Sequence, residues 1–192
     1  MGLLSWLFKK KKGSLGDPDN TREAQRLLRD IYTEEISGVN NFSIKVERYS
    51  PQERLIRYMV KAPTLTYTRK KIEVVTATIH TLVLSELVYP FIYFLLRDRV
   101  IDLMKDSEFE ELMKSYRLPF REFTMSKISK PIPIDEEYFV EIKLDKNSGK
   151  RKKRGGKQTY WTIMASCNYV IENKKGETVA RGILKNVAVI QG

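Results

Sequence analysis

The longest apolar run of the chain lies between Tyr67 and Arg99 and reads YTRKKIEVVTATIHTLVLSELVYPFIYFLLRDR. The segment Val74–Leu96 has 23 residues, whereas an ordinary strand has about 5–6. We therefore expect one long helix, with a kink near Pro90 because proline removes a backbone donor. The run is apolar nearly all round, so this helix is either enclosed by protein or spans a membrane.

Two features favour the enclosed helix. Glu86 would lie near the centre of a bilayer, at a cost of roughly 2.5–3.5 kcal/mol. The segments on both sides alternate like strands of a half-buried sheet, and such a sheet needs a helix to cover it. A run of ~20 apolar residues is nevertheless long enough to cross a bilayer, so a membrane span stays the alternative.

Three elements are expected before this helix. Apolar residues at helical spacing predict a helix from about Thr21 to Ile36, capped by Asn20 or Thr21. From Phe42 the period changes to two, which predicts a strand, and Arg54–Lys61 forms a second strand after a turn.

After the long helix we expect a short amphipathic helix at Asp106–Tyr116 and then a strand-rich remainder. Four strands are expected there: Phe120–Ser129, Tyr138–Leu144, Thr159–Glu172 and Thr178–Ile190. The stretch KNSGKRKKRGGKQ between the second and third strands is interpreted as a basic hairpin loop.

The net charge and the single cysteine and histidine limit the classes of function that the chain can have. The net charge is +11 and the pI is about 9.6, which predicts attraction to nucleic acid, acidic lipid or a phosphate-bearing ligand. Cys167 is the only cysteine and His80 the only histidine, which excludes an intramolecular disulfide and a cysteine- or histidine-based zinc site. We expect no metal, no cofactor and a reducing, cytoplasmic setting.

Two passages carry a resemblance to a known family. FTMSKISKPIPIDEEYFVEIKL and ENKKGETVARGILKNVAVI resemble the strand–turn–strand passage and the last hairpin of hotdog-fold acyl-CoA and acyl-carrier-protein thioesterases. The resemblance implies an α+β fold in which a curved antiparallel sheet wraps a long central helix, here with an extra N-terminal helix. The domain would cover residues 21–192, after a tail at 1–20. A cone-shaped, nuclear-transport-factor type of fold is the runner-up.

The same resemblance implies an acyl-thioester hydrolase. Thioester hydrolysis needs a carboxylate to activate water and donors for the developing oxyanion. Glu73 matches the acidic residue of the resembling enzymes by position, and Thr76 and His80 would share its helical face. Arg69, Lys70 and Lys71 at the helix start would hold the ligand's phosphates. The His-Gly-Gly step of many thioesterases is missing here, so a non-catalytic protein that binds acyl-CoA or lipid remains an alternative.

Two further basic runs predict contact with polyanions or an acidic membrane. The first, Lys9, Lys10, Lys11 and Lys12, follows the apolar block LLSWLF, which forms either a weak interfacial anchor or a disordered, sticky terminus. The second contains Arg151, Lys152, Lys153 and Arg154. No nucleic-acid motif accompanies them, so sequence-specific nucleic-acid binding is not expected. A basic adaptor for nucleic acid or acidic membrane is the third functional alternative.

The expected ligand is an acyl-CoA or an acylated carrier protein, and the expected location is the cytoplasm, with peripheral membrane attachment as a variant of it. We also expect a homodimer or a higher oligomer. A single hotdog sheet leaves strand edges unpaired and one side of its helix poorly covered.

Overall fold

The computed structural model describes residues 17–31, 39–40, 43–61, 64–65, 74–101, 120–125, 130–154 and 158–191. The helices and strands are α1 (Pro18–Ile31), β1 (Val39–Asn40), β2 (Ser43–Ser50), β3 (Leu55–Lys61), β4 (Thr64–Leu65), α3 (Ala77–Arg97), β5 (Phe120–Met125), β6 (Glu137–Arg154), β7 (Gln158–Glu172) and β8 (Thr178–Gln191). The predicted helix at 106–116 lies outside the described residues.

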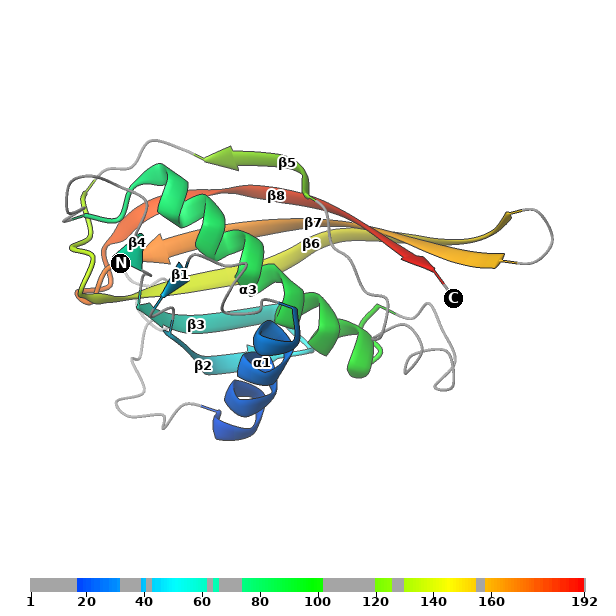
Figure 1. Cartoon of the computed structure of the whole chain (residues 1–192), viewed down its shortest axis with the longest axis horizontal. Helices are drawn as coiled ribbons and strands as arrows, with labels where there is room; N and C mark the ends of the chain where they lie inside the picture. The colour runs from blue at the N-terminus through cyan, green and yellow to red at the C-terminus, as the bar shows by residue number, and fades with distance from the viewer. Residues whose placement is uncertain are drawn as a thin grey trace, which may run out of the picture.

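Six antiparallel strands form one curved sheet in the order β2-β3-β6-β7-β8-β5, and β1 pairs separately with β4. Figure 1 shows α3 lying diagonally across one face of this sheet, with α1 beside β2. The predicted α+β fold is confirmed: a long central helix is wrapped by an antiparallel sheet and preceded by an extra helix.

Helix α3 is the core of the protein. It is long and apolar enough to cross a membrane, but 78% of its most apolar 18-residue window is buried inside the protein. Val83, Leu87, Phe91 and Phe94 are at most 1% exposed. Burial on this scale fits the enclosed helix, because the sheet supplies the apolar surroundings that a bilayer would otherwise provide.

The helix begins at Ala77, three residues later than the sequence predicts. Val74 forms a β-bridge with Pro133, and the backbone N–H of Val75 donates to the carbonyl of Ile132 at 2.7 Å. These two contacts hold Val74 and Val75 in an extended conformation. The apolar pattern therefore starts before the first residue of the helix.

Helix α1 covers the outer edge of the sheet. The backbone N–H of Asp17 donates to the carbonyl of Val46 at 2.9 Å, and Val46 N–H donates to the hydroxyl of Thr21 at 2.8 Å. Gln25 Nε2 donates to the carbonyl of Ile44 at 2.9 Å. Polar groups of edge strand β2 are therefore satisfied by α1, which protects that edge from pairing with another chain.

The predicted cap of this first helix was wrong. The carboxylate of Asp17 accepts the backbone N–H of Asn20 at 3.1 Å, and Pro18 occupies the first helical position. Proline suits that position because its missing N–H would have no helical partner there. Thr21 instead uses its hydroxyl to bond β2.

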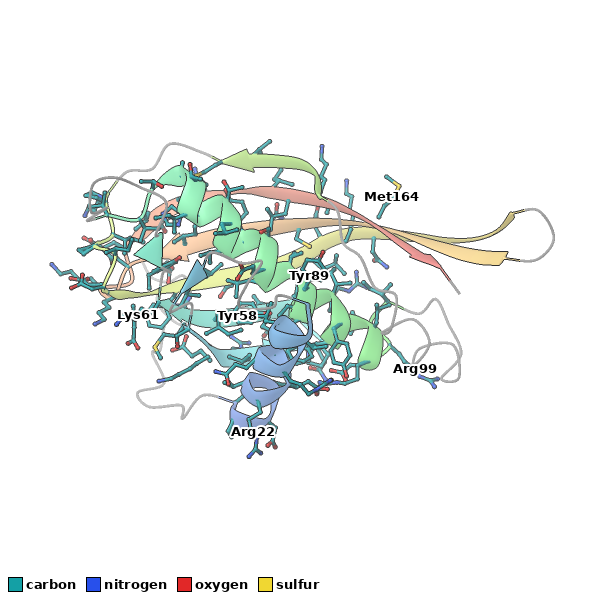
Figure 2. The ribbon with its side chains drawn as sticks, viewed as in Figure 1. Arg22, Tyr58, Lys61, Tyr89, Arg99 and Met164 are labelled. Carbon is teal, nitrogen blue, oxygen red and sulfur yellow. The ribbon has the colours of Figure 1, made fainter. Side chains whose placement is uncertain are left out.

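The sheet presents an apolar face to α3. Alternate residues of β6 are buried, as the sequence predicted: Tyr138, Val140, Ile142 and Leu144. The hydroxyl of Tyr58 on β3 donates to the backbone carbonyl of Leu87 on α3 at 3.0 Å (Figure 2). This bond ties the sheet to the middle of the helix.

At the other side of the sheet, Tyr169 on β7 reaches across β8. Its hydroxyl donates to the backbone carbonyl of Thr124 on β5 at 3.0 Å, passing Gly182 on β8. A Cβ atom at Gly182 would overlap the Thr124 carbonyl oxygen and lie 2.6 Å from the Tyr169 hydroxyl. The glycine therefore gives Tyr169 room to join three strands.

The basic run after Leu144 is strand, not loop. A register shift between Leu144 and Lys146 lets β6 continue to Arg154, paired with β7 as far as Gln158. Pairing with β7 outweighs the turn preference of the intervening glycine and lysines, so Arg151, Lys152, Lys153 and Arg154 belong to a long β-ribbon. Figure 1 shows this ribbon extending well beyond α3.

Candidate functional site

Most of the basic and acidic residues predicted for the site lie outside the described residues. This group comprises Arg69, Lys70, Lys71 and Glu73, together with Lys9, Lys10, Lys11 and Lys12. The predicted helical stripe of Glu73, Thr76 and His80 is wrong for Thr76, which has extended backbone angles (φ −82°, ψ 169°) and precedes the first helical residue, Ala77.

Thr76 is the N-cap of α3. Its side-chain hydroxyl accepts the backbone N–H of Ile79 at 3.4 Å, and its carbonyl accepts the backbone N–H of His80 at 3.0 Å. A threonine in this role satisfies a helix donor that would otherwise have no partner. The described contacts of Thr76 are thus those of a helix cap.

His80 lies one turn into α3 and is fully buried, with 0% exposure. Neither ring nitrogen has a hydrogen-bond partner in the described structure. Burial lowers the pKa of His80 to about 4, because an apolar environment disfavours the charged imidazolium. The imidazole is therefore neutral at pH 7, with one nitrogen able to donate and the other able to accept.

Tyr138, at the start of β6, packs against His80. The two rings meet edge to face with centroids 5.7 Å apart and an interplanar angle of 84°. The Tyr138 hydroxyl is also buried without a partner. Burial, and then the nearby charge of Glu86, raise the pKa of Tyr138 well above its ordinary value. The hydroxyl therefore keeps its proton and can donate a hydrogen bond.

Glu86 is the third buried polar group here, and its side chain is 4% exposed. Burial raises its pKa to about 7, so the carboxyl is partly protonated near neutral pH. Arg97, in the last turn of the same helix, instead pairs with Glu23 and Asp98. A carboxyl with a pKa near the working pH is suited to proton transfer.

Unsatisfied buried polar groups are rare in folded proteins, and each costs about 1–3 kcal/mol. Among the described side chains only Tyr49, His80 and Tyr138 have such atoms, and two of these three lie in ring contact. Together they place a neutral imidazole and a phenolic donor in a core in which Glu86 is the other buried polar side chain described. Such a pair can hydrogen-bond a carbonyl oxygen that enters with an apolar chain.

The described residues give less support to a metal site or to a cysteine nucleophile. They contain no group of three or more His, Cys, Asp or Glu side chains that could hold a metal ion. Cys167 is fully buried, and burial raises the pKa of its thiol to about 12. A thiol that stays protonated is a poor nucleophile.

Sequence patterns singled out His80 but could not pair it with Tyr138. The alternation along β6 does place Tyr138 on the inward face. The contact itself depends on how α3 crosses the sheet, and no local pattern encodes that. Glu86 was visible as a charge in an apolar run, and the sheet that encloses it accounts for its raised pKa.

No protein-family model matches the chain, and no curated protein sequence matches it significantly. Solved structures of three bacterial proteins are similar to it. A candidate thioesterase from Syntrophus aciditrophicus has 15% identity and a TM-score of 0.45, with 90% of this chain and 98% of that chain covered. A mutant thioesterase from Pseudomonas aeruginosa has 10% identity and a TM-score of 0.45, with coverages of 92% and 96%.

A thioesterase from Haemophilus influenzae has 10% identity and a TM-score of 0.42, with 86% of this chain and 89% of that chain covered. The element order of the chain itself is two long strands, a buried central helix and four further antiparallel strands. With its curved sheet wrapped around α3, the chain has a hotdog-like α+β fold.

Proposed function

We propose that the protein hydrolyses acyl thioesters, with acyl-CoA or an acylated carrier protein as substrate. The observation that carries this proposal is the contact between His80 and Tyr138, two buried polar side chains without partners in an apolar core. A thioester combines an apolar chain with one carbonyl group, and this is the combination that such a site would accept. The hotdog-like fold supports the same ligand class.

In the proposed reaction a carboxylate removes a proton from water, which adds to the thioester carbonyl. The Tyr138 hydroxyl and the protonated nitrogen of His80 donate hydrogen bonds to the developing oxyanion. The intermediate then expels the thiolate, which takes up the proton held by the carboxyl. Glu73, just before α3, is the first candidate for this base, and Glu86 is the second because its pKa is about 7.

The acyl chain would extend from His80 along the same side of α3. Val83 and Leu87 lie on this side, three and seven residues after His80, and both are at most 1% exposed. An apolar chain beside them would be shielded from water, which is favourable in proportion to the area buried.

A silent acyl-CoA-binding protein is the second candidate. It is favoured by the absence of the His-Gly-Gly step that many of the resembling thioesterases carry. The two candidates share one ligand class and differ only in turnover.

A panel of acyl-CoA chain lengths, assayed for both binding and thiol release, separates the candidates. Hydrolase activity predicts thiol release by the wild type and a loss of about 10²–10⁴ in rate for Glu73→Gln or Glu86→Gln, whichever residue is the base. Binding without release would favour the silent protein. The absence of both would contradict the proposal.

A further inference from the structure

The charged side chains in one part of the β6–β7–β8 ribbon are all positive. The proposed hydrolysis does not use them. Residues 146–171 contain seven lysines and arginines, residues 178–192 contain two more, and neither segment contains an aspartate or a glutamate. The described parts of these segments belong to β6, β7 and β8, and the far end of these strands extends beyond α3 in Figure 1. The ribbon is therefore strongly cationic compared with the rest of the sheet.

The strand register gathers part of this charge on one face. Lys146 on β6, Ser166 on β7 and Lys185 on β8 form one cross-strand row, and both lysines are exposed. Ala165 and Cys167, the neighbours of Ser166, are buried on the opposite face, toward α3.

The same face also exposes apolar side chains. Met164 is 42% exposed and Ile183 is 39% exposed, and these are two of the three large apolar side chains so exposed in the described structure. Met164 pairs with Ser148 and Val187, in the row next to that of Lys146 and Lys185. Figure 2 shows the Met164 side chain projecting from the ribbon.

We propose that this outward face of the β6–β7–β8 ribbon docks on a bilayer surface that contains acidic phospholipids. Lysines next to exposed apolar side chains match such a surface, because the cations meet headgroup phosphates while the apolar groups enter the interface. A nucleic acid would use the charge but would leave Met164 and Ile183 exposed to water. The apolar component therefore favours lipid, and the docking is independent of the thioesterase reaction.

The test uses the full-length chain and vesicles of phosphatidylcholine with or without phosphatidylglycerol. Lys146→Gln combined with Lys185→Gln is compared with Lys174→Gln combined with Lys175→Gln, which removes the same charge from the exposed turn at the opposite end of β7. Each lysine at an acidic surface contributes about fivefold. The ribbon variant should therefore lose about twenty-five-fold in partitioning to acidic vesicles, and the turn variant much less.

A second measurement reports insertion directly. A polarity-sensitive dye is attached at Met164→Cys and, as a matched control, at Lys175→Cys. The native Cys167 is buried and does not compete for the dye. Fluorescence should increase with acidic vesicles only for the dye at position 164. A double-stranded DNA oligonucleotide is tested with the same charge variants.

Three results would overturn the proposal. The first is equal loss of vesicle binding in the ribbon and turn variants. The second is vesicle binding without any response of the dye at position 164, which would move the contact elsewhere, for example to the lysines at 9–12. The third is binding of the oligonucleotide without binding of acidic vesicles.

Discussion

The ring of His80 meets the ring of Tyr138 edge on, at 5.7 Å, and the polar atoms of both side chains are buried without a partner. A purely structural contact would be expected to lose nothing when the phenolic oxygen is removed. A ligand-binding contact would lose the donor that the ligand needs. Variants of Tyr138 and Tyr58, two of the buried tyrosines of this core, can separate these cases.

Tyr138→Phe should leave the free energy of unfolding unchanged or slightly higher, because it removes a buried hydroxyl that has no partner. If Tyr138 holds the oxyanion, the rate of thioester hydrolysis should fall by about 10²–10³. Denaturant unfolding and thiol release are measured on the same sample.

Tyr58→Phe is the matched control, since Tyr58 is equally buried but bonds the Leu87 carbonyl. This variant should lose about 1 kcal/mol of stability and keep its rate. An unchanged rate in Tyr138→Phe would remove this residue from the reaction.

The raised pKa of Glu86 predicts a dependence of stability on pH. Its carboxyl ionises near 4.5 in the unfolded chain and near 7 in the folded protein. Between these values the folded state holds more protons, so this contribution to stability is complete below pH 4.5 and is lost as pH rises through 7. Glu86→Gln cannot ionise, so its stability relative to wild type should rise by roughly 3 kcal/mol between pH 4.5 and 8.

The lowered pKa of His80 predicts a pH dependence of stability with the opposite sign. Its pKa is lowered from 6.5 to about 4 in the folded protein, so its contribution is present above pH 6.5 and is lost as pH falls toward 4. His80→Phe should therefore gain stability relative to wild type as the pH is lowered. Chemical denaturation at several pH values measures both variants, and curves that stay parallel to the wild type would contradict the burial of these groups.

Gly182→Ala should destabilise the protein by about 3 kcal/mol, because the added methyl group would overlap the Thr124 carbonyl oxygen and displace the Tyr169 hydroxyl. Gly176→Ala is the control. Its Cβ would meet no atom within 4 Å, although φ is +75°, so only about 1–2 kcal/mol of backbone strain is expected. Thermal or denaturant unfolding compares the two, and equal losses would count against the bond between Tyr169 and Thr124.

We expect the dimer predicted from the sequence to form through the free edge of strand β5. Helix α1 occupies the β2 edge, and within the described residues no strand pairs with the free side of β5. Light scattering at micromolar concentration should give twice the 22.5 kDa chain mass. A bifunctional thiol reagent should cross-link Glu122→Cys on β5 but not Lys45→Cys on β2. Monomer mass alone, or cross-linking through position 45, would contradict this arrangement.

Sequence patterns predicted the elements better than the contacts between them. The alternation of Tyr138 to Leu144 correctly assigned the buried face of β6, because a two-residue period directly reflects which side meets the core. The start of α3 was placed three residues too early, since the extension of Val74 depends on its bridge to Pro133. The strand at Arg151–Arg154 was missed because its stability comes from pairing with β7.

The site was predicted only in part for the same reason. His80 stood out as the single histidine in an apolar run. Its partner Tyr138 is 58 positions away in the sequence, on another element. Thr76 had been placed on the helical face of His80 from its spacing, and that inference fails because Thr76 has extended backbone angles before α3 begins.

His80 as the only histidine permits the most direct test of the proposed site. Its imidazole resonances can be followed by NMR without assignment, first as a pH titration and then with a non-hydrolysable acyl-CoA thioether. We predict a pKa near 4 in the free protein and a shift of the ring nitrogens when the thioether binds, with no such shift on adding CoA alone. A pKa near 6.5, or ring resonances that stay unchanged when the thioether is saturating, would contradict the assignment of His80 and Tyr138 to the acyl-thioester site.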